Sequence, residues 1–191
     1  MKTKTQHNIK LLFVFLSFLL SSVTLFARLN NPDDFNPYMK SGECEINSGD
    51  FKTGNNSQLF VQKSDDFELR LKQNSSVSIS KNPLALTDEL EIKNGVIGLK
   101  VASDTLYIKT PYADVRLRNA TVIIRVSEKL VRLCVLEGTA IFIKNSNFVP
   151  VNKGNEIAAS KDKLSKIYKY LDDLRFVWYW KSPEEEPSLK N

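Results

Sequence analysis

Apolar and polar residues alternate along most of the chain between residues 42 and 160. In the stretch DFELRLKQ, residues 66–73, every second side chain is apolar, and similar alternation recurs in SQLFVQ (57–62), SSVSISK (75–81) and DVRLR (114–118). A period of two places the apolar side chains on one face of an extended strand. Turn-forming residues separate these stretches. The pattern predicts an all-β domain over residues 42–160.

Three glycines share one local pattern. An apolar residue is followed three positions later by glycine in IKNG (92–95), VLEG (135–138) and VNKG (151–154). A glycine repeated in this relation indicates turns that need a positive φ, where a Cβ is penalised. The pair Asn94-Gly95 is also a strong signal for a tight hairpin between two apolar segments. We therefore expect a weak internal repeat of strand, turn and strand, and we interpret Glu137 as a turn residue exposed to solvent.

The hydrophobic period changes after Ser160, which is suited to begin a helix. Spacings of three and four connect the apolar residues Leu164, Ile167, Leu171, Leu174 and Trp178. This stripe predicts one amphipathic helix over residues 161–180. The aromatic residues at its end, including Trp178 and Trp180, either pack over an open end of the β-domain or form an exposed patch for a partner. Residues 181–191 are acidic and proline-marked, and we expect them to be disordered.

The first 27 residues have the composition of an export signal. Three lysines precede an apolar run, residues 11–26, and the small residue Ala27 follows it. We expect cleavage after Ala27. An uncleaved membrane anchor is the alternative, although the run is short for a span, which needs about 20 apolar residues. Residues 28–41 carry prolines among Asn and Asp, and we expect an irregular lead-in there.

The charge balance does not favour a nucleic-acid partner. The formal charge is +5, from 27 basic and 22 acidic residues, but three of the lysines lie in the signal segment, which contains no acid. The rest of the chain therefore has 24 basic and 22 acidic residues. A nucleic-acid-binding domain is expected to show a basic stripe or cluster, and the sequence has none.

Side chains suited to catalysis or metal binding are sparse. The only histidine, His7, lies in the signal segment, so the exported part has no histidine for Ser-His or Cys-His catalysis or for a metal site. Cys44 and Cys134 could form a disulfide in an exported protein, or Cys134 could be a buried free thiol in an apolar strand. We therefore expect no enzyme activity, no metal site and no cofactor.

The second half of the β-domain carries a recognisable pattern. It comprises TPYADVRLRNATVIIRV (110–126), VRLCVLEGTAIFI (131–143) and VPVNKGNEI (149–157), and together with upstream strands it resembles the FecR domain over about residues 42–160. The positions that fit the family pattern are Thr110, Pro111, Val115, Leu117, Arg118, Glu137, Gly138 and Gly154. The resemblance implies an all-β envelope module with a β-helix-like or sandwich-like twist.

Some positions depart from that family pattern. Ala113 stands where the family usually has glycine, which puts the geometry of that turn in question. Asn119-Ala120 replaces Gly-Thr, and Asn119 is expected to keep the backbone conformation because asparagine tolerates the left-handed region best after glycine.

Two functions are consistent with these observations. The first is a non-catalytic exported binding or scaffold module of the bacterial cell envelope, which contacts a protein partner through strand edges or through a face that contains Arg116 and Arg118. The second is a signal-relay or ligand-sensing protein held at the inner membrane, facing the periplasm, by an uncleaved first segment. Family members that regulate iron uptake carry a cytoplasmic sigma-factor-binding region before a membrane helix. Only ten residues precede the apolar run here, so we expect that mechanism not to apply.

Overall fold

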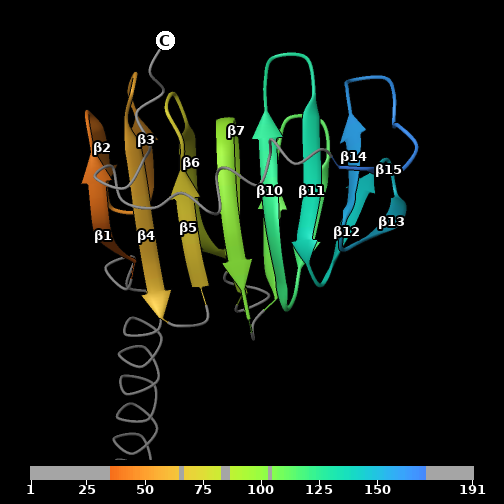
Figure 1. Ribbon diagram of the computed structural model, residues 1–191, viewed down its shortest axis with the longest axis horizontal. Coiled ribbons are helices and arrows are strands. Elements are labelled where there is room, and N and C mark those ends of the chain that lie inside the picture. The colour runs from red at the N-terminus through yellow and green to blue at the C-terminus, as the bar shows by residue number, and fades with distance from the viewer. Residues whose placement is uncertain (1–34, 65–66, 83–86, 103–104, 171–191) are drawn as a thin grey trace, which may run out of the picture. The chain divides into compact units, whose positions relative to one another are not determined.

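The computed structural model describes residues 35–64, 67–82, 87–102 and 105–170. These residues form fifteen β-strands that stand side by side in two layers, with β7 near the middle of the row (Figure 1). Within these ranges there is no helix with the length and apolarity that a membrane crossing requires. The prediction of an all-β domain is confirmed for the described residues.

The two layers share one strand. In order of pairing, the first layer contains β1 (Asn36–Ser41), β4 (Gln58–Ser64), β5 (Phe67–Leu71), β7 (Thr87–Val101), β10 (Ala120–Val126), β11 (Val131–Glu137), β14 (Asn155–Ala159) and β15 (Tyr168–Lys169). The second layer contains β2 (Cys44–Asn47), β3 (Asp50–Thr53), β6 (Ser76–Asn82), β7, β8 (Leu106–Lys109), β9 (Asp114–Leu117), β12 (Thr139–Lys144) and β13 (Asn147–Asn152). Only the β7–β8 pairing is parallel; the other pairings between these strands are antiparallel.

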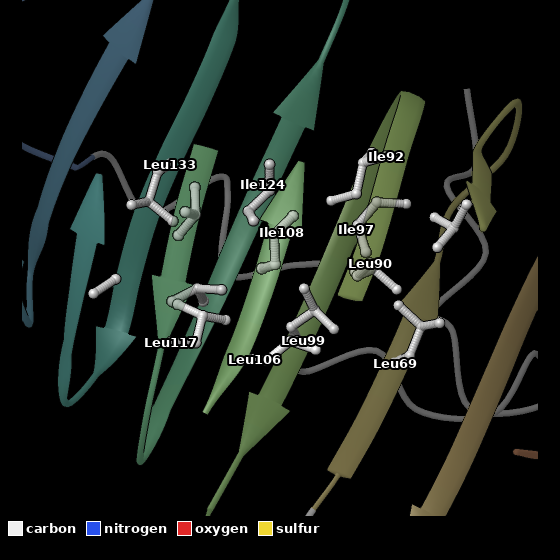
Figure 2. Packing of buried hydrophobic residues seen from close by; sticks show 14 of the residues in the cluster. Leu69, Leu90, Ile92, Ile97, Leu99, Leu106, Ile108, Leu117, Ile124 and Leu133 are labelled. Atoms are coloured by element: carbon white, nitrogen blue, oxygen red, sulfur yellow. The ribbon is translucent and has the colours of Figure 1, made fainter. Parts of the chain in front are cut away.

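Alternation along the strands builds one core between the layers. Side chains from both layers meet there, among them Leu69, Ile97, Leu99 and Ile124 of the first layer and Leu90, Ile108 and Leu117 of the second (Figure 2). Each of these side chains is fully buried. Burial of one such side chain stabilises the fold by about 1.5–3 kcal/mol, so this core is the main source of stability.

Every passage between the layers that is fully described contains one residue with positive φ. We call these the corner residues. They are Gly42, Asn56, Asn74, Gly95, Asn119, Gly138 and Gly154. The left-handed conformation turns the backbone sharply out of one sheet and toward the other, and only glycine and asparagine adopt it readily. The glycines of the weak sequence repeat therefore lie where the chain passes from one layer to the other.

The corner residues form two stacks, one at each end of the strands. The first contains Gly42, Asn56, Asn74 and Gly95, and the second contains Asn119, Gly138 and Gly154. In the first half, the amide of Gly54 donates to the carbonyl of Glu43 at 2.8 Å and the amide of Asn74 donates to the carbonyl of Gly54 at 3.0 Å. In the second half, the amide of Lys153 donates to the carbonyl of Gly138 at 3.0 Å. Val101 pairs with both Phe67 and Ala120, six residues along β7 from Gly95. Asn119 directly precedes Ala120, so the second stack lies at the end of the strands opposite the first.

The predicted hairpin at Asn94-Gly95 is wrong. β7 continues through this pair as one 15-residue strand. Its first part pairs with β6 and β8 in the second layer, and the part that begins at Gly95 pairs with β5 and β10 in the first. The predicted positive φ is present, at 107° for Gly95, but it bends the strand from one layer to the other instead of reversing it. A Cβ on Gly95 would lie 2.5 Å from the Cα of Ser75, so only glycine fits this crossing.

Two further predictions require correction. The expected irregular lead-in, residues 28–41, ends in β1, which pairs with β4 and takes up Pro37 beside a register shift. The helix expected over residues 161–180 is not formed in its described part, residues 161–170. There Leu164 bridges Ala159, and β15 pairs with β14. Over residues 161–170, backbone hydrogen bonds along the free edge of β14 stabilise the chain more than an amphipathic helix would. Residues 171–180, the signal segment 1–27 and the tail 181–191 lie outside the described residues.

Candidate protein-binding face

Arg116 and Arg118 lie on the outer side of the second layer. In β9, alternation turns Val115 and Leu117 into the core and the two arginines toward solvent. The register places Arg116 opposite Tyr107 of β8 and Ile141 of β12. Because side chains two residues apart on a strand share one face, Arg118 continues the same surface.

A hollow of about 300 Å³ opens on this surface. The residues that line it are Thr105, Tyr107, Arg116, Leu117, Arg118, Thr139 and Ile141. The two predicted surface arginines are thus brought together with an aromatic ring, an aliphatic side chain and two hydroxyl groups. This volume is at the lower limit of small-molecule sites, and it suits one or two side chains of a partner.

The arginines carry uncompensated charge. Neither guanidinium forms an ion pair with any carboxylate of the described residues. The neighbouring cation differs, because Lys109 Nζ lies 2.7 Å from Glu89 Oε1, and this hydrogen bond and charge raise the pKa of Lys109. Burial raises the pKa of the Asp114 carboxyl, on β9, and the charge of Lys109 acts in the opposite direction. The positive charge of the face therefore comes from Arg116 and Arg118.

Exposed apolar side chains extend the surface toward the end of the second layer. Tyr107 is 38% exposed and Phe148 is 64% exposed, although both are large hydrophobic residues. Phe148 pairs across the strands with Ile143, and Pro150 pairs with Ile141. Aromatic residues beside arginine are enriched in protein-binding surfaces. We call the surface formed by Tyr107, Arg116, Arg118, Ile141 and Phe148 the arginine face.

The edge strand β13 is protected against strand addition. It pairs with β12 alone, through a two-residue loop, Asn145-Ser146, in which both residues have positive φ. Such a loop is flanked by a hydrogen-bonded pair, so the alternating pattern directs the backbone groups of residues 148, 150 and 152 toward the open edge. Pro150 has no N–H to offer there. The strand-edge contact considered from the sequence is therefore disfavoured at β13, and the outer face is favoured.

The family-pattern residues build turns. At the β8–β9 turn, the hydroxyl of Thr110 donates to the carbonyl of Ala113, and the amide of Ala113 donates back to Thr110 Oγ1 at 3.3 Å, beside Pro111. Ala113 therefore keeps this turn closed without the usual glycine. Asn119 has φ 48° and Gly138 has φ 73°, as their residue types predict.

The acid-glycine pair ends β11. The hydroxyl of Thr121 lies 3.3 Å from Glu137 Oε2, the carboxylate is exposed, and the chain passes to β12 at Gly138. A Cβ on Gly138 would lie 2.2 Å from the carbonyl oxygen of Asn119. This pair therefore shapes the corner, as the sequence predicts. At Gly154, which has φ 81°, a Cβ would meet nothing within 4 Å.

The two cysteines are separate free thiols, so the disulfide considered from the sequence is not formed. Cys44 Sγ lies 3.3 Å from the carbonyl oxygen of Gln58, in the first half of the chain. Cys134 Sγ lies 3.5 Å from Glu156 Oε2, in a small cluster with Ile123 and Leu136. Burial and the charge of Glu156 raise the pKa of Cys134 to about 12. This thiol is protonated at neutral pH and is a poor nucleophile.

Not every predicted site residue can be placed, and some members of the face were not predicted. Trp178 and Trp180 lie outside the described residues. Tyr107 and Phe148 were missed, although the position of Tyr107 between the buried Leu106 and Ile108 indicates an outward side chain. In the part of the chain that the structure describes, no three His, Cys, Asp or Glu side chains are grouped so that they could hold a metal ion.

Solved structures share the fold at low sequence identity. Two crystal structures of a candidate anti-sigma factor from Parabacteroides distasonis, at 1.65 and 2.50 Å resolution, match with TM-scores of 0.57 and identities of 14% and 12%. The matches cover 68% and 73% of this chain, and the chain spans 62% and 63% of the length of those chains. At this identity the likeness concerns the fold.

The family comparison covers the centre of the β-domain. No curated protein matches the chain. The family model described as FecR protein matches residues 49–140, a range that includes Arg116, Arg118, Tyr107 and the corner residues Gly95, Asn119 and Gly138. The resemblance seen in the sequence is thereby confirmed for residues 49–140, which match the FecR family.

Proposed function

We propose that this chain is a signal-relay protein of the bacterial cell envelope, in which the FecR domain binds a protein partner through the arginine face. The observation that carries the proposal is the pair of exposed arginines that have no carboxylate partner among the described residues, beside exposed aromatic rings, in the range that matches the FecR family model. The fold shared with a candidate anti-sigma factor is consistent with a role in signalling.

Signal relay is favoured over a purely structural scaffold. Both functions considered from the sequence need a protein partner, but the match of residues 49–140 to the FecR family model and the fold of the solved structures favour signalling. The face also belongs to a sheet whose core side chains are fully buried, so a bound partner meets a preorganised surface. Rigid presentation of a few anchors is what recognition by a small module requires.

The proposal includes export and the absence of catalysis. The lysines and the apolar run of the first 27 residues support export, and they leave the choice between a cleaved signal and a membrane tether to experiment. The buried thiol of Cys134, with a pKa of about 12, and the absence of a histidine after residue 7 support a non-enzymatic role. N-terminal sequencing of the mature protein distinguishes a tether from a cleaved chain that begins at Arg28.

A deletion experiment tests the relay. Deletion of the gene in the host bacterium should change the abundance of a confined set of transcripts, and complementation with the wild-type chain should restore it. A scaffold would instead lose an envelope complex without a confined transcriptional response. Crosslinking in intact cells, followed by capture of the tagged chain, should recover one reproducible envelope protein. Recovery of no partner together with an unchanged transcript profile would rule the proposal out.

A further inference from the structure

We propose that the arginine face recognises an extended acidic segment of the partner, with two carboxylates at alternate positions and an aromatic or aliphatic side chain two residues further along the same face of the segment. This inference rests on the proposed function and specifies its partner. The segment would lie along β9, over the hollow between β8 and β12. It would bind to the outer side of the second layer rather than join the edge of β13.

The spacing of the arginines sets the spacing of the acids. Arg116 lies in β9 and Arg118 directly follows its last residue, Leu117, so with Leu117 extended their Cα atoms are separated by about 7 Å. An extended peptide of the form Glu-x-Glu presents its carboxylates with the same repeat, because it has the same rise per residue. Each guanidinium can then donate two hydrogen bonds to one carboxylate, which is the bidentate geometry that arginine provides and lysine does not.

The hollow accepts an apolar side chain two residues from one of the acids, because in an extended segment only such a side chain faces the same surface as the carboxylates. Its lining combines the ring of Tyr107, the side chain of Ile141 and the hydroxyl groups of Thr105 and Thr139, and about 300 Å³ accommodates one or two side chains. An aromatic or branched residue placed there would bury apolar surface in the middle of the arginine face, while the ion pairs lie beside it. Interfaces concentrate their binding energy in such central anchors.

The charge distribution disfavours polyanions as ligands. Nucleic acids and anionic lipid surfaces are bound by several cations spread over a surface. Here the neighbouring lysine, Lys109, is paired with Glu89, and Asp114 lies on the same strand two residues before Arg116. Two charges at a defined spacing suit a short acidic segment better than a continuous polyanion. The absence of an N–H at Pro150 disfavours a partner strand at the β13 edge.

Binding of a labelled peptide to the purified chain tests the inference. The probe is a short fluorescent peptide that contains Glu-Ser-Glu-Ser-Tyr, so that both Glu side chains and the Tyr ring share one face when the peptide is extended, and the matched peptide has Gln in place of Glu. Fluorescence anisotropy should show at least about tenfold weaker binding of the Gln peptide, because charge-assisted pairs are lost. The double variant Arg116→Glu and Arg118→Glu should lose at least about tenfold in affinity for the Glu peptide. Raised salt should weaken wild-type binding as well.

Arg125→Glu is the matched control. Arg125 is an exposed arginine on β10, in the first layer, and its reversal changes the charge of a different face by the same amount as reversal of one of the two face arginines. It should leave the affinity for the Glu peptide within about twofold of wild type. Circular dichroism of both variants should retain the wild-type β spectrum, since the altered side chains are exposed. A similar loss for Arg125→Glu and the double variant would overturn the inference, because the attraction would then be unspecific.

Other ligands give distinct results. Binding of anionic vesicles, of duplex DNA or of a second copy of the chain that is tighter than peptide binding and is lost in the double variant would overturn the acidic-segment assignment. In intact cells, the double variant should fail to capture the crosslinked partner that wild type and Arg125→Glu capture. Capture that survives the double reversal would refute this inference and leave the proposed function standing. Failure of wild-type capture would count against the proposed function itself.

Discussion

The two halves of the sheet are built alike but differ in what they offer to solvent. In the first half, from β1 to β7, exposed and half-buried charges are paired: Lys52 with Glu45 at 3.1 Å and Arg70 with Glu68 at 2.5 Å. The hydroxyl of Tyr38 also donates to Glu68, and burial together with that carboxylate raises the pKa of Tyr38 to about 12. In the second half, Arg132 lies 3.9 Å from Glu156, but Arg116 and Arg118 have no carboxylate partner among the residues that the structure describes.

The difference shows that the fold and the binding surface place separate demands on the sequence. Both halves need corner residues and buried alternation. Surface pairs contribute little to stability, typically below about 1 kcal/mol, so the lack of a described carboxylate partner at Arg116 and Arg118 costs the fold little. Arginines can therefore remain available there for a partner. The following predictions test, from the largest effect to the smallest, how far the halves depend on each other.

Leu99→Ala should have the largest effect, because Leu99 lies on the strand that both layers share and is fully buried. We expect a loss of about 3 kcal/mol in the free energy of unfolding, from lost transfer energy and the cavity left behind. Urea denaturation followed by fluorescence measures it. The exposed neighbour, Lys100→Ala, should change stability by less than about 0.5 kcal/mol. Equal effects of the two would contradict the core assigned to β7.

Gly138→Ala should destabilise the second half more than Gly154→Ala. Both residues have positive φ, which costs alanine about 1–2 kcal/mol. At Gly138 the new Cβ would also lie 2.2 Å from the carbonyl oxygen of Asn119, whereas at Gly154 it would meet nothing within 4 Å. We expect the difference in unfolding free energy to be at least about 1 kcal/mol. Equal losses in chemical denaturation would show that the corner stack is not closely packed.

Lys144→Met should loosen the end of the second layer. Lys144 is buried, and its Nζ donates to the carbonyl oxygens of Tyr112 at 3.1 Å and Lys161 at 3.0 Å. Removal of the donor leaves both acceptors unpaired and should cost about 1–3 kcal/mol. Thermal unfolding compares this variant with Lys153→Met, an exposed lysine that should be nearly neutral. A neutral Lys144→Met would mean that water replaces the ammonium group.

Asp114→Asn should have the smallest effect, with a pH dependence of defined sign. Burial raises the pKa of this carboxyl in the folded state, so the folded protein holds the proton more tightly than the unfolded chain. Stability from this group is present at low pH and is lost as pH rises through the folded pKa. The variant should therefore be slightly more stable than wild type at pH 7, by a small amount because the group is half-exposed. Below about pH 4 the urea midpoints of the variant and of wild type should converge. A difference that grows at low pH would contradict a raised pKa of Asp114.

The sequence predicts the strands and corner residues better than their connections. Alternation around Val115 and Leu117 specifies which side chains are buried, and Asn119 and Gly138 have the conformations their residue types favour. Gly95 shows the limit. A positive φ serves equally well in a hairpin and in a strand that changes layer, and only the pairing of β7 with β5 and β10 distinguishes the two.

The binding face shows the same limit. The outward direction of Arg116 and Arg118 follows from the period of two. Their neighbours Tyr107 and Ile141 come from strands whose register is fixed by long-range pairing, which a local pattern does not reveal. The predicted helix fails over residues 161–170 for a related reason, since the open edge of β14 is a tertiary feature.

The continuity of β7 has a mechanical consequence. The same backbone is hydrogen-bonded in both layers, so tension on the strands of one half reaches the other through covalent bonds as well as through side-chain packing. A force applied to one half is therefore transmitted to the other half. The two layers also resist separation, because β7 belongs to both. Under the proposed signalling role, this continuity would mechanically couple the two ends of the sheet.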